Sequence, residues 1–245
     1  MDKQVATLIE LQPAFLLHAR PFRDNSFILD FFAPDLGRVS AIARGGRGAK
    51  SKNKSLLQPF IPLHISLSGK HDLKTLRTVE LRQSAPVLKG ERLFSAMYMN
   101  EIIVRLFHGH EADPGFFRCY EQALFSLGSS AEPEAVLREF ELALLDALGY
   151  GVDFSAEGHT HLPLSAEAWY CFEPERGLVK VQLRDAVAEP AAEQQAYAGQ
   201  CLLAIHERDF TDSETRRTAK LILRQILNSH LGPTPVRSRS LFARP

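Results

Sequence analysis

Five short segments in the first 81 residues have the pattern of β-strands, and no helical periodicity separates them. These segments are residues 13–22, 26–33, 39–43, 60–67 and 74–81. The turn sequence Pro-Asp-Leu-Gly at 34–37 joins the second and third segments into a hairpin that spans residues 26–44. Five short strands without a long helix predict a small closed barrel or a sandwich.

The loop that follows the third segment is strongly basic. Between Leu36 and His71 the chain has seven Lys or Arg residues and no Asp or Glu. The seven are Arg38, Arg44, Arg47, Lys50, Lys52, Lys54 and Lys70. So much unpaired positive charge repels itself and favours an external polyanion, most often the repeated phosphates of nucleic acid. A five-stranded barrel with a basic hairpin is the oligonucleotide-binding (OB) arrangement, although the strand pattern alone also suits an SH3-like barrel.

The fifth segment and several aromatic residues extend this candidate surface. Lys74 and Arg77 add two basic residues beyond the loop. Four phenylalanines of the first two segments have rings that suit stacking on bases, although most aromatic residues of a small barrel belong to its core. They are Phe22, Phe27, Phe31 and Phe32.

Beyond residue 85 the apolar residues follow a helical period. We expect helices near residues 91–108, 113–128, 132–148, 191–207 and 213–231, and an irregular insert at about 150–188 with a short hairpin. The sequence therefore predicts an α+β protein, with an OB domain at 1–84 and a mainly helical domain at 85–245. Residues 1–84 carry 13 basic and 7 acidic residues, whereas residues 85–245 carry 16 and 22. This asymmetry also assigns the polyanion to the first domain.

The last expected helix has a basic stripe beside its apolar one. At about 100° per residue, Arg216, Arg217, Lys220 and Arg224 fall within one arc of about 100°. The helix is therefore able to pack and still present positive charge. Such a stripe suits either a further DNA contact or the ordinary solvation of a helix surface.

No motif for catalysis or metal binding stands out. Residues 44–51 miss the register of a phosphate-binding loop, and no nucleophile elbow or paired-carboxylate motif is present. The histidine pairs at 108/110 and 159/161 lack a second pair at metal-site spacing, and the three separate cysteines make no disulfide framework. We therefore expect no enzymatic activity, no cofactor and no metal. With no signal region and no membrane span, we expect a cytoplasmic location.

Four segments spread over nearly the whole chain carry a family resemblance. They are Ala-Phe-Leu-Leu-His-Ala-Arg-Pro-Phe (14–22), Gly-Arg-Val-Ser-Ala-Ile-Ala-Arg-Gly-Gly-Arg (37–47), Leu-Arg-Glu-Phe-Glu-Leu-Ala-Leu-Leu-Asp-Ala-Leu-Gly-Tyr-Gly (137–151) and His-Leu-Gly-Pro-Thr-Pro-Val-Arg-Ser-Arg-Ser-Leu-Phe (230–242). In this order they resemble the RecO family of bacterial recombination mediators. The resemblance implies an N-terminal OB barrel and a helical C-terminal domain. It also implies binding of single- and double-stranded DNA, annealing of complementary strands, and association with the nucleoid.

The resemblance has further implications for partners and metal. It implies loading of the recombinase RecA onto strands coated by single-stranded-DNA-binding protein (SSB), with RecR as a partner, and docking of the acidic, apolar SSB tail on the helical domain. Arg118, Leu137 and Arg138 are our candidates for the tail site, because an arginine fork fits a terminal carboxylate beside an apolar groove. An ion pair with a helix-surface glutamate is the competing use of Arg138. Many members carry four zinc-binding cysteines after Leu-Gly-Tyr, but residues 151–163 contain none, so the chain resembles the zinc-less branch.

Two functions of other classes remain open. One is an RNA-binding or ribosome-associated protein that uses the same barrel, and the other is an enzyme with a scattered active site in the helical domain. Annealing assays with DNA and RNA separate the first from a DNA mediator. A deep polar pocket with strongly shifted ionisable groups would favour the second.

Overall fold

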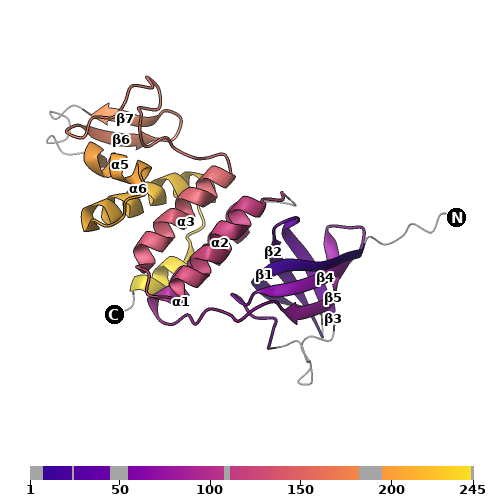
Figure 1. The fold of residues 1–245 in the computed structure, drawn as a ribbon. Coiled ribbons are helices and arrows are strands. Elements are labelled where there is room, and N and C mark those ends of the chain that lie inside the picture. The colour runs from indigo at the N-terminus through magenta and orange to yellow at the C-terminus, as the bar shows by residue number, and fades with distance from the viewer. Residues whose placement is uncertain (1–7, 24, 45–54, 108–110, 182–194, 244–245) are drawn as a thin grey trace. The chain divides into compact units, whose positions relative to one another are not determined.

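The computed structural model describes residues 8–23, 25–44, 55–107, 111–181 and 195–243 (Figure 1). The chain forms two compact units, residues 1–131 with 235–245, and residues 132–234. The first unit includes two helices as well as the barrel, so the domain boundary near residue 84 stays a prediction. None of the described helices is both long enough and apolar enough to cross a membrane.

The first unit is built on a closed barrel with the strand order β1-β2-β3-β5-β4. Its strands are β1 (Leu8–Phe22), β2 (Ser26–Ala33), β3 (Gly37–Arg44), β4 (Leu63–Ser68) and β5 (Leu73–Leu81). Neighbouring strands are antiparallel except β3 and β5, whose parallel pairing helps to close the barrel. This is the five-stranded barrel that the strand pattern predicted, and with the helices that follow it confirms the α+β class with an OB barrel.

The barrel interior is filled by alternate residues of the strands. Phe31, Val39, Leu63 and Ile65 are almost fully buried members of one apolar cluster. The predicted turn at 34–37 requires a glycine at its end. Gly37 has a φ of 59°, and a Cβ there would lie 2.2 Å from the Glu111 carbonyl oxygen.

Two helices of the same unit, α1 (Glu91–Leu106) and α2 (Pro114–Leu127), pack on the outside of the barrel. The helix start predicted at Asp113-Pro114 is confirmed, since the Asp113 side chain accepts a hydrogen bond from the Phe116 amide at 2.8 Å. The buried Asn100 amide donates to the Leu17 carbonyl at 3.0 Å and accepts from the Tyr120 hydroxyl at 2.6 Å. This network fastens both helices to β1.

The chain returns to the first unit through the 3₁₀ helix η1 (Arg237–Ala243), which docks on α1. The Glu101 carboxylate accepts hydrogen bonds from the Arg237 amide at 2.8 Å, the Ser238 amide at 2.8 Å and the Ser238 hydroxyl at 2.7 Å. The Phe242 ring meets the Phe94 ring edge to face, with centroids 6.1 Å apart. We call this contact the Glu101 clasp.

The second unit combines helices with a small sheet. Its elements are α3 (Pro133–Ala147), β6 (Trp169–Glu173), β7 (Gly177–Val181), β8 (Ala196–Ala198), α5 (Gly199–His206) and α6 (Ser213–Leu231). The sheet is antiparallel in the order β7-β6-β8, and the hairpin predicted in the insert is confirmed as β6 and β7.

Three predicted elements were partly wrong. The first strand begins at Leu8 and not at residue 13, because Leu8 and Ile9 pair with Ser68 and Leu67 of β4. Residues 196–198 are a strand and not part of a helix from 191, because Tyr197 pairs with Tyr170 on β6 and is buried. The helix begins only at Gly199, where a Cβ would lie 2.0 Å from the Ser165 carbonyl oxygen. The fourth strand begins at Leu63 and not at residue 60, since Phe60 has a positive φ of 68° that breaks the extended backbone.

Candidate nucleic-acid interface

The outer surface of β1, β2, β3 and β5 is organised in cross-strand rows of side chains. Leu29 and Ala41 belong to the interior cluster, so the residues that alternate with them lie on the outside. The pairing of strands defines four outer rows, in order along the barrel. They are Phe15–Phe32–Arg38, His18–Asp30–Ser40–Leu73, Arg20–Ile28–Ile42–Thr75 and Phe22–Ser26–Arg44.

The first of these rows is covered by the helices of the same unit. Phe32 lies 5.5–5.9 Å from the rings of Phe107, Phe116, Phe117 and Tyr120, measured between centroids. Arg38 donates a hydrogen bond to the Val104 carbonyl near the C-terminal end of α1. Arg38 is therefore engaged inside the unit, where a cation suits a helix C-terminus.

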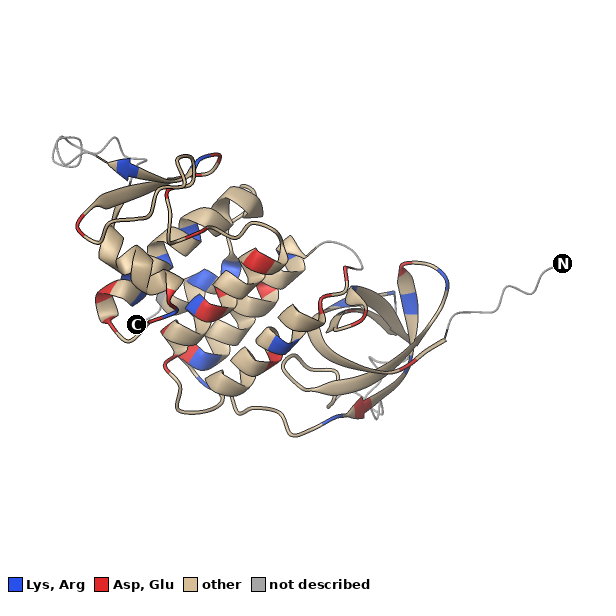
Figure 2. Cartoon of the chain, turned by 45° about the horizontal axis from the view of Figure 1, so that its top comes forward, with Lys and Arg blue, Asp and Glu red and all other residues tan. Residues whose placement is uncertain are grey.

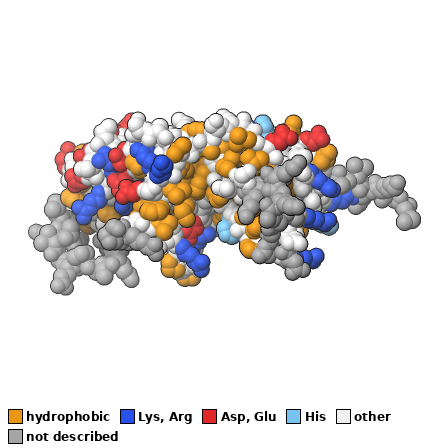
Figure 3. Space-filling view, turned by 90° about the horizontal axis from the view of Figure 1, so that it is seen from below, with side chains coloured by type: hydrophobic (Ala, Val, Ile, Leu, Met, Phe, Trp, Pro, Cys, Tyr) orange, Lys and Arg blue, Asp and Glu red, His pale blue; other side chains and the backbone are white. Residues whose placement is uncertain are grey.

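The opposite half of the outer face carries basic side chains that are open to solvent. Arg20 and Arg44 are exposed, and neither forms an ion pair with any residue in the described ranges. Arg77 is also exposed, two residues beyond Thr75 on β5, and its Nε donates to the Ser68 hydroxyl at 2.6 Å. Figure 3 shows basic side chains gathered on the barrel, at the right of the view. We call Arg20, Arg44 and Arg77 with the partly exposed Phe22 and Ile42 the open barrel face.

The second row, next to the covered one, brings an acid close to a histidine and a hydroxyl. Asp30 is 9% exposed, and its carboxylate accepts a hydrogen bond from the Ser40 hydroxyl at 2.5 Å. The other carboxylate oxygen lies 4.0 Å from Nδ1 of the exposed His18. Because Asp30 lies between the covered row and Arg20, phosphates are favoured on the arginine side, away from α1 and α2.

The predicted loop contacts are only partly within the described ranges. Arg47, Lys50, Lys52 and Lys54 lie outside the described residues. Lys74 donates to the Gly69 carbonyl at 3.3 Å, and Lys70 is exposed with an electrostatic or hydrogen-bond partner of its own. Of the four phenylalanines proposed for stacking, Phe31 and Phe32 are fully buried and Phe27 packs against the core. Phe22 is the one that lies on the outer face and is partly exposed to solvent.

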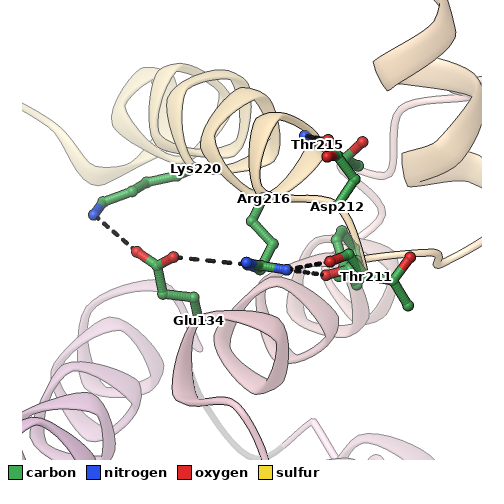
Figure 4. A network of polar contacts seen from close by, with 7 residues as sticks. Glu134, Thr211, Asp212, Thr215, Arg216 and Lys220 are labelled. Carbon is green, nitrogen blue, oxygen red and sulfur yellow. Dashed lines mark hydrogen bonds and ion pairs between the residues drawn. The ribbon is translucent and has the colours of Figure 1, made fainter.

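The four basic residues of α6 have different environments, and Figure 4 shows two of them, Arg216 and Lys220. Arg216 is half-buried, and its guanidinium donates to the carbonyls of Phe210 and Thr211 at 2.7 Å each. Lys220 is exposed, with Nζ 3.4 Å from the Glu134 carboxylate. Arg217 and Arg224 are exposed and pair with no described carboxylate. Figure 2 shows the wider pattern, in which basic and acidic residues are interspersed along the helices.

The residues proposed for the SSB tail also differ in exposure. Arg118 is exposed on α2, in the first unit. Leu137 and Arg138 are buried on α3, in the second unit, with 6% and 5% of their surface exposed. Arg138 forms an ion pair with Glu141 at 3.1 Å, which is the competing use expected for it.

The shifted ionisable groups have structural explanations. Burial raises the pKa of Tyr120, and burial with a nearby Cys171 raises the pKa of Tyr197 to about 12. Hydrogen bonds from Ser155 lower the pKa of Asp153, with help from His206. Among the described residues, no group of three or more His, Cys, Asp or Glu side chains is arranged to hold a metal ion.

Comparison with known proteins decides the family. The family model described as Recombination protein O N terminal matches residues 8–85, and the one described as Recombination protein O C terminal matches residues 88–240. The chain belongs to the RecO family. A DNA repair protein RecO of Vibrio cholerae is 42% identical over 232 residues, which cover 95% of this chain and 93% of the relative. The RecO proteins of Tolumonas auensis and Coxiella burnetii are 40% and 39% identical, over 96% and 99% of this chain and 95% and 100% of the relatives.

In this RecO-family chain, close backbone packing organises the part of the insert around residues 151–163, which contain no cysteine. The Gly158 amide donates to the Leu178 carbonyl at 2.9 Å, and a Cβ on Gly158 would lie 2.2 Å from the Arg176 carbonyl oxygen. The Ser165 amide donates to the Tyr170 hydroxyl at 2.8 Å. These contacts tie the segment before β6 to the hairpin.

Sequence reasoning missed Arg20 as a candidate contact. Arg20 was read only as part of a strand, because it lies outside the basic loop. The signal was the alternation of His18, Arg20 and Phe22, which places all three on one face of β1. This alternation alone does not show that Arg20 belongs to a shared surface, because the neighbouring strands bring Arg20 into a row with Thr75 of β5.

Proposed function

We propose that this RecO-family protein is a non-catalytic DNA repair and recombination mediator that binds single- and double-stranded DNA through the open barrel face and the 44–54 loop. The observation that carries the proposal is the division of one OB surface. Helices cover its Phe32 end, while its Arg44 end presents solvent-exposed arginines beside partly exposed apolar side chains. Such a combination supports backbone contacts by cations and base contacts by apolar groups.

The same surface supports annealing without any chemical step. Two DNA strands repel each other, and a basic surface reduces this repulsion when it replaces condensed counterions. From the family we further propose that the protein anneals complementary strands, acts with RecR, and helps to load RecA onto SSB-coated DNA. Such work on chromosomal DNA corresponds to a cytoplasmic, nucleoid-associated location.

Docking of the SSB tail belongs to the same proposal, and the exposure of Arg118 supports this residue as the cation that binds the tail. A tail carboxylate that binds Arg138 has to displace Glu141 and break a buried ion pair, which is costly. Arg118 is exposed and carries no such cost. Arg118→Ala should therefore weaken binding of a fluorescent tail peptide, whereas Arg138→Met/Glu141→Leu should leave it nearly unchanged. A tail site at Arg138 predicts the reverse.

The open barrel face is tested by fluorescence anisotropy with single-stranded DNA, duplex DNA and RNA of one sequence. The variant Arg20→Ala/Arg44→Ala/Arg77→Ala should bind single-stranded DNA at least about tenfold more weakly at low salt, a change of about 1.4 kcal/mol. A variant with the same change in charge in the second unit, Arg176→Ala/Lys180→Ala/Arg208→Ala, should bind nearly as the wild type does.

Two results would contradict the proposal. Equal losses in both variants would show that net charge, and not this face, governs binding. Tighter binding and faster annealing of RNA than of DNA would favour the RNA-binding alternative.

A further inference from the structure

Helix α6 presents one exposed basic stripe. Arg217, Lys220 and Arg224 are three and four residues apart and are all exposed, so they lie on the same side of the helix. The other side is packed, with Ala219, Leu223 and similar residues buried. The stripe therefore faces solvent, while the apolar side anchors the helix in the second unit.

Arg216, although adjacent, is committed to the fold. It donates to two carbonyls in the turn that precedes α6, where the Asp212 side chain also accepts from the Thr215 amide at 2.8 Å (Figure 4). Removing Arg216 would leave the turn without these bonds. Arg216 is therefore a structural residue.

Lys220 is shared between the stripe and a carboxylate on α3. Its Nζ lies 3.4 Å from one oxygen of Glu134, and the other oxygen lies 4.0 Å from Nε of Arg216. The side chains of Lys220 and Glu134 are 59% and 54% exposed. An ion pair this exposed is weak, so an anionic ligand is able to compete with Glu134 for the lysine.

Arg217 and Arg224 are the unengaged ends of the stripe. They are seven residues apart, which is about 10 Å along a helix, with Lys220 between them. Neither meets a carboxylate among the residues that the structure describes. Three cations in a line suit a ligand with successive negative charges, and the arginine fork suits phosphate oxygens in particular.

We propose that Arg217, Lys220 and Arg224 form a second binding surface for a phosphodiester backbone, and that Glu134 weakens this surface by holding Lys220. The inference rests on the proposed DNA binding and adds a site in the unit that does not contain the barrel. Glu134 acts in two ways. It occupies a cation that a phosphate would use, and its own charge repels that phosphate.

The direction in which one substitution changes the affinity for an oligonucleotide distinguishes this binding surface from a helix that is only solvated. Glu134→Gln should tighten binding of a labelled oligothymidylate at low salt by about two- to five-fold, the range expected when one exposed ion pair no longer competes. Glu139→Gln is the matched control. It makes the same change of charge on an exposed residue of α3, about 140° round the helix from Glu134. In a Lys220→Ala background, most of the effect of Glu134→Gln should disappear.

The salt dependence of binding tests the arginines. Arg217→Ala/Arg224→Ala should flatten the log–log slope by about 1.4, since each single-strand phosphate contact contributes about 0.7. Lys180→Ala/Arg208→Ala, in the same unit and with the same change of charge, should leave the slope unchanged.

Equal effects in each variant and its control, with wild-type binding intact, would overturn this second surface and leave the barrel proposal standing. A wild-type protein that does not bind the oligonucleotide would overturn both.

Discussion

The buried pair Asn100 and Tyr120 allows a stability prediction from single hydrogen bonds. Asn100 is 4% exposed and Tyr120 is fully buried, and together they join α1 and α2 to the backbone of β1. Tyr120→Phe keeps the ring against Phe15 but removes the donor to Asn100. A buried carbonyl oxygen left without a donor costs about 1–3 kcal/mol, so the free energy of unfolding should fall by that amount.

Asn100→Leu should lower the free energy of unfolding further, because two buried groups each lose a hydrogen bond to Asn100. The Leu17 carbonyl loses its donor and the Tyr120 hydroxyl loses its acceptor. At about 1–3 kcal/mol for each group, the expected loss of unfolding free energy is about 2–6 kcal/mol. The double variant should be more stable than the sum of the single losses predicts, because the two groups share one bond. A coupling of about 0.5–3 kcal/mol is expected.

Urea unfolding followed by circular dichroism measures these differences. Tyr150→Phe is the matched control, because its side chain is 44% exposed and the loss of its hydroxyl should change stability by no more than about 0.5 kcal/mol. If Tyr120→Phe changes stability as little as the control does, or if the two single losses simply add, the network does not fasten the helices to the barrel.

The Glu101 clasp, the insert and the Arg138 ion pair each allow a direct test. Glu101→Gln should lower the free energy of unfolding by about 0.5–1.5 kcal/mol at neutral pH, after allowance for solvent screening. Partial burial raises the pKa of Glu101, but hydrogen bonds from Ser238 and its neighbour bring it below its ordinary value. The higher free energy of unfolding of the wild type, relative to Glu101→Gln, is therefore fully present above a pH of about 4.3 and is lost as the pH falls through the lowered pKa. A difference between the two proteins in urea melts that does not change with pH would contradict the clasp. Purified, untagged protein should hold no stoichiometric zinc and should stay folded in a chelator, because residues 151–163 have no cysteine; unfolding by the chelator would show the opposite. Arg138→Ala should lower the free energy of unfolding by about 3–5 kcal/mol and Arg138→Met/Glu141→Leu should restore most of it, whereas a small loss in the single variant would mean that the pair is not buried in solution.

Local sequence signals predicted elements whose causes are local. The turn at 34–37 and the start of α2 at Asp113-Pro114 are set by residues within four positions of each other, and both were correct. The strand at 196–198 was missed because Tyr197 is held by Tyr170, a partner far along the chain. A short Ala-Tyr-Ala segment before a helix has no local feature that reveals such a partner.

The candidate site shows the same limit. The composition of the sequence reveals a basic loop. Whether each basic side chain binds inside the protein or stays open to a ligand depends on neighbours that the sequence does not show. Arg38 and Arg216 donate to backbone carbonyls, while Arg217 remains exposed one residue away. Arg20 lay outside the basic loop and became a candidate only through the pairing of β1 with β2.

The salt dependence of DNA affinity tests the central claim most directly. For wild-type protein and single-stranded DNA, the log–log slope of affinity against salt should be on the order of −3 to −4, as expected for four to six neutralised phosphates. Removing Arg20, Arg44 and Arg77 together should flatten it by about 2, at about 0.7 per contact. Replacing the three loop lysines Lys50, Lys52 and Lys54 by Ala should flatten it by the smaller part of the slope that the arginines do not supply. A wild-type slope near zero, or one that neither variant changes, would contradict DNA binding by the barrel.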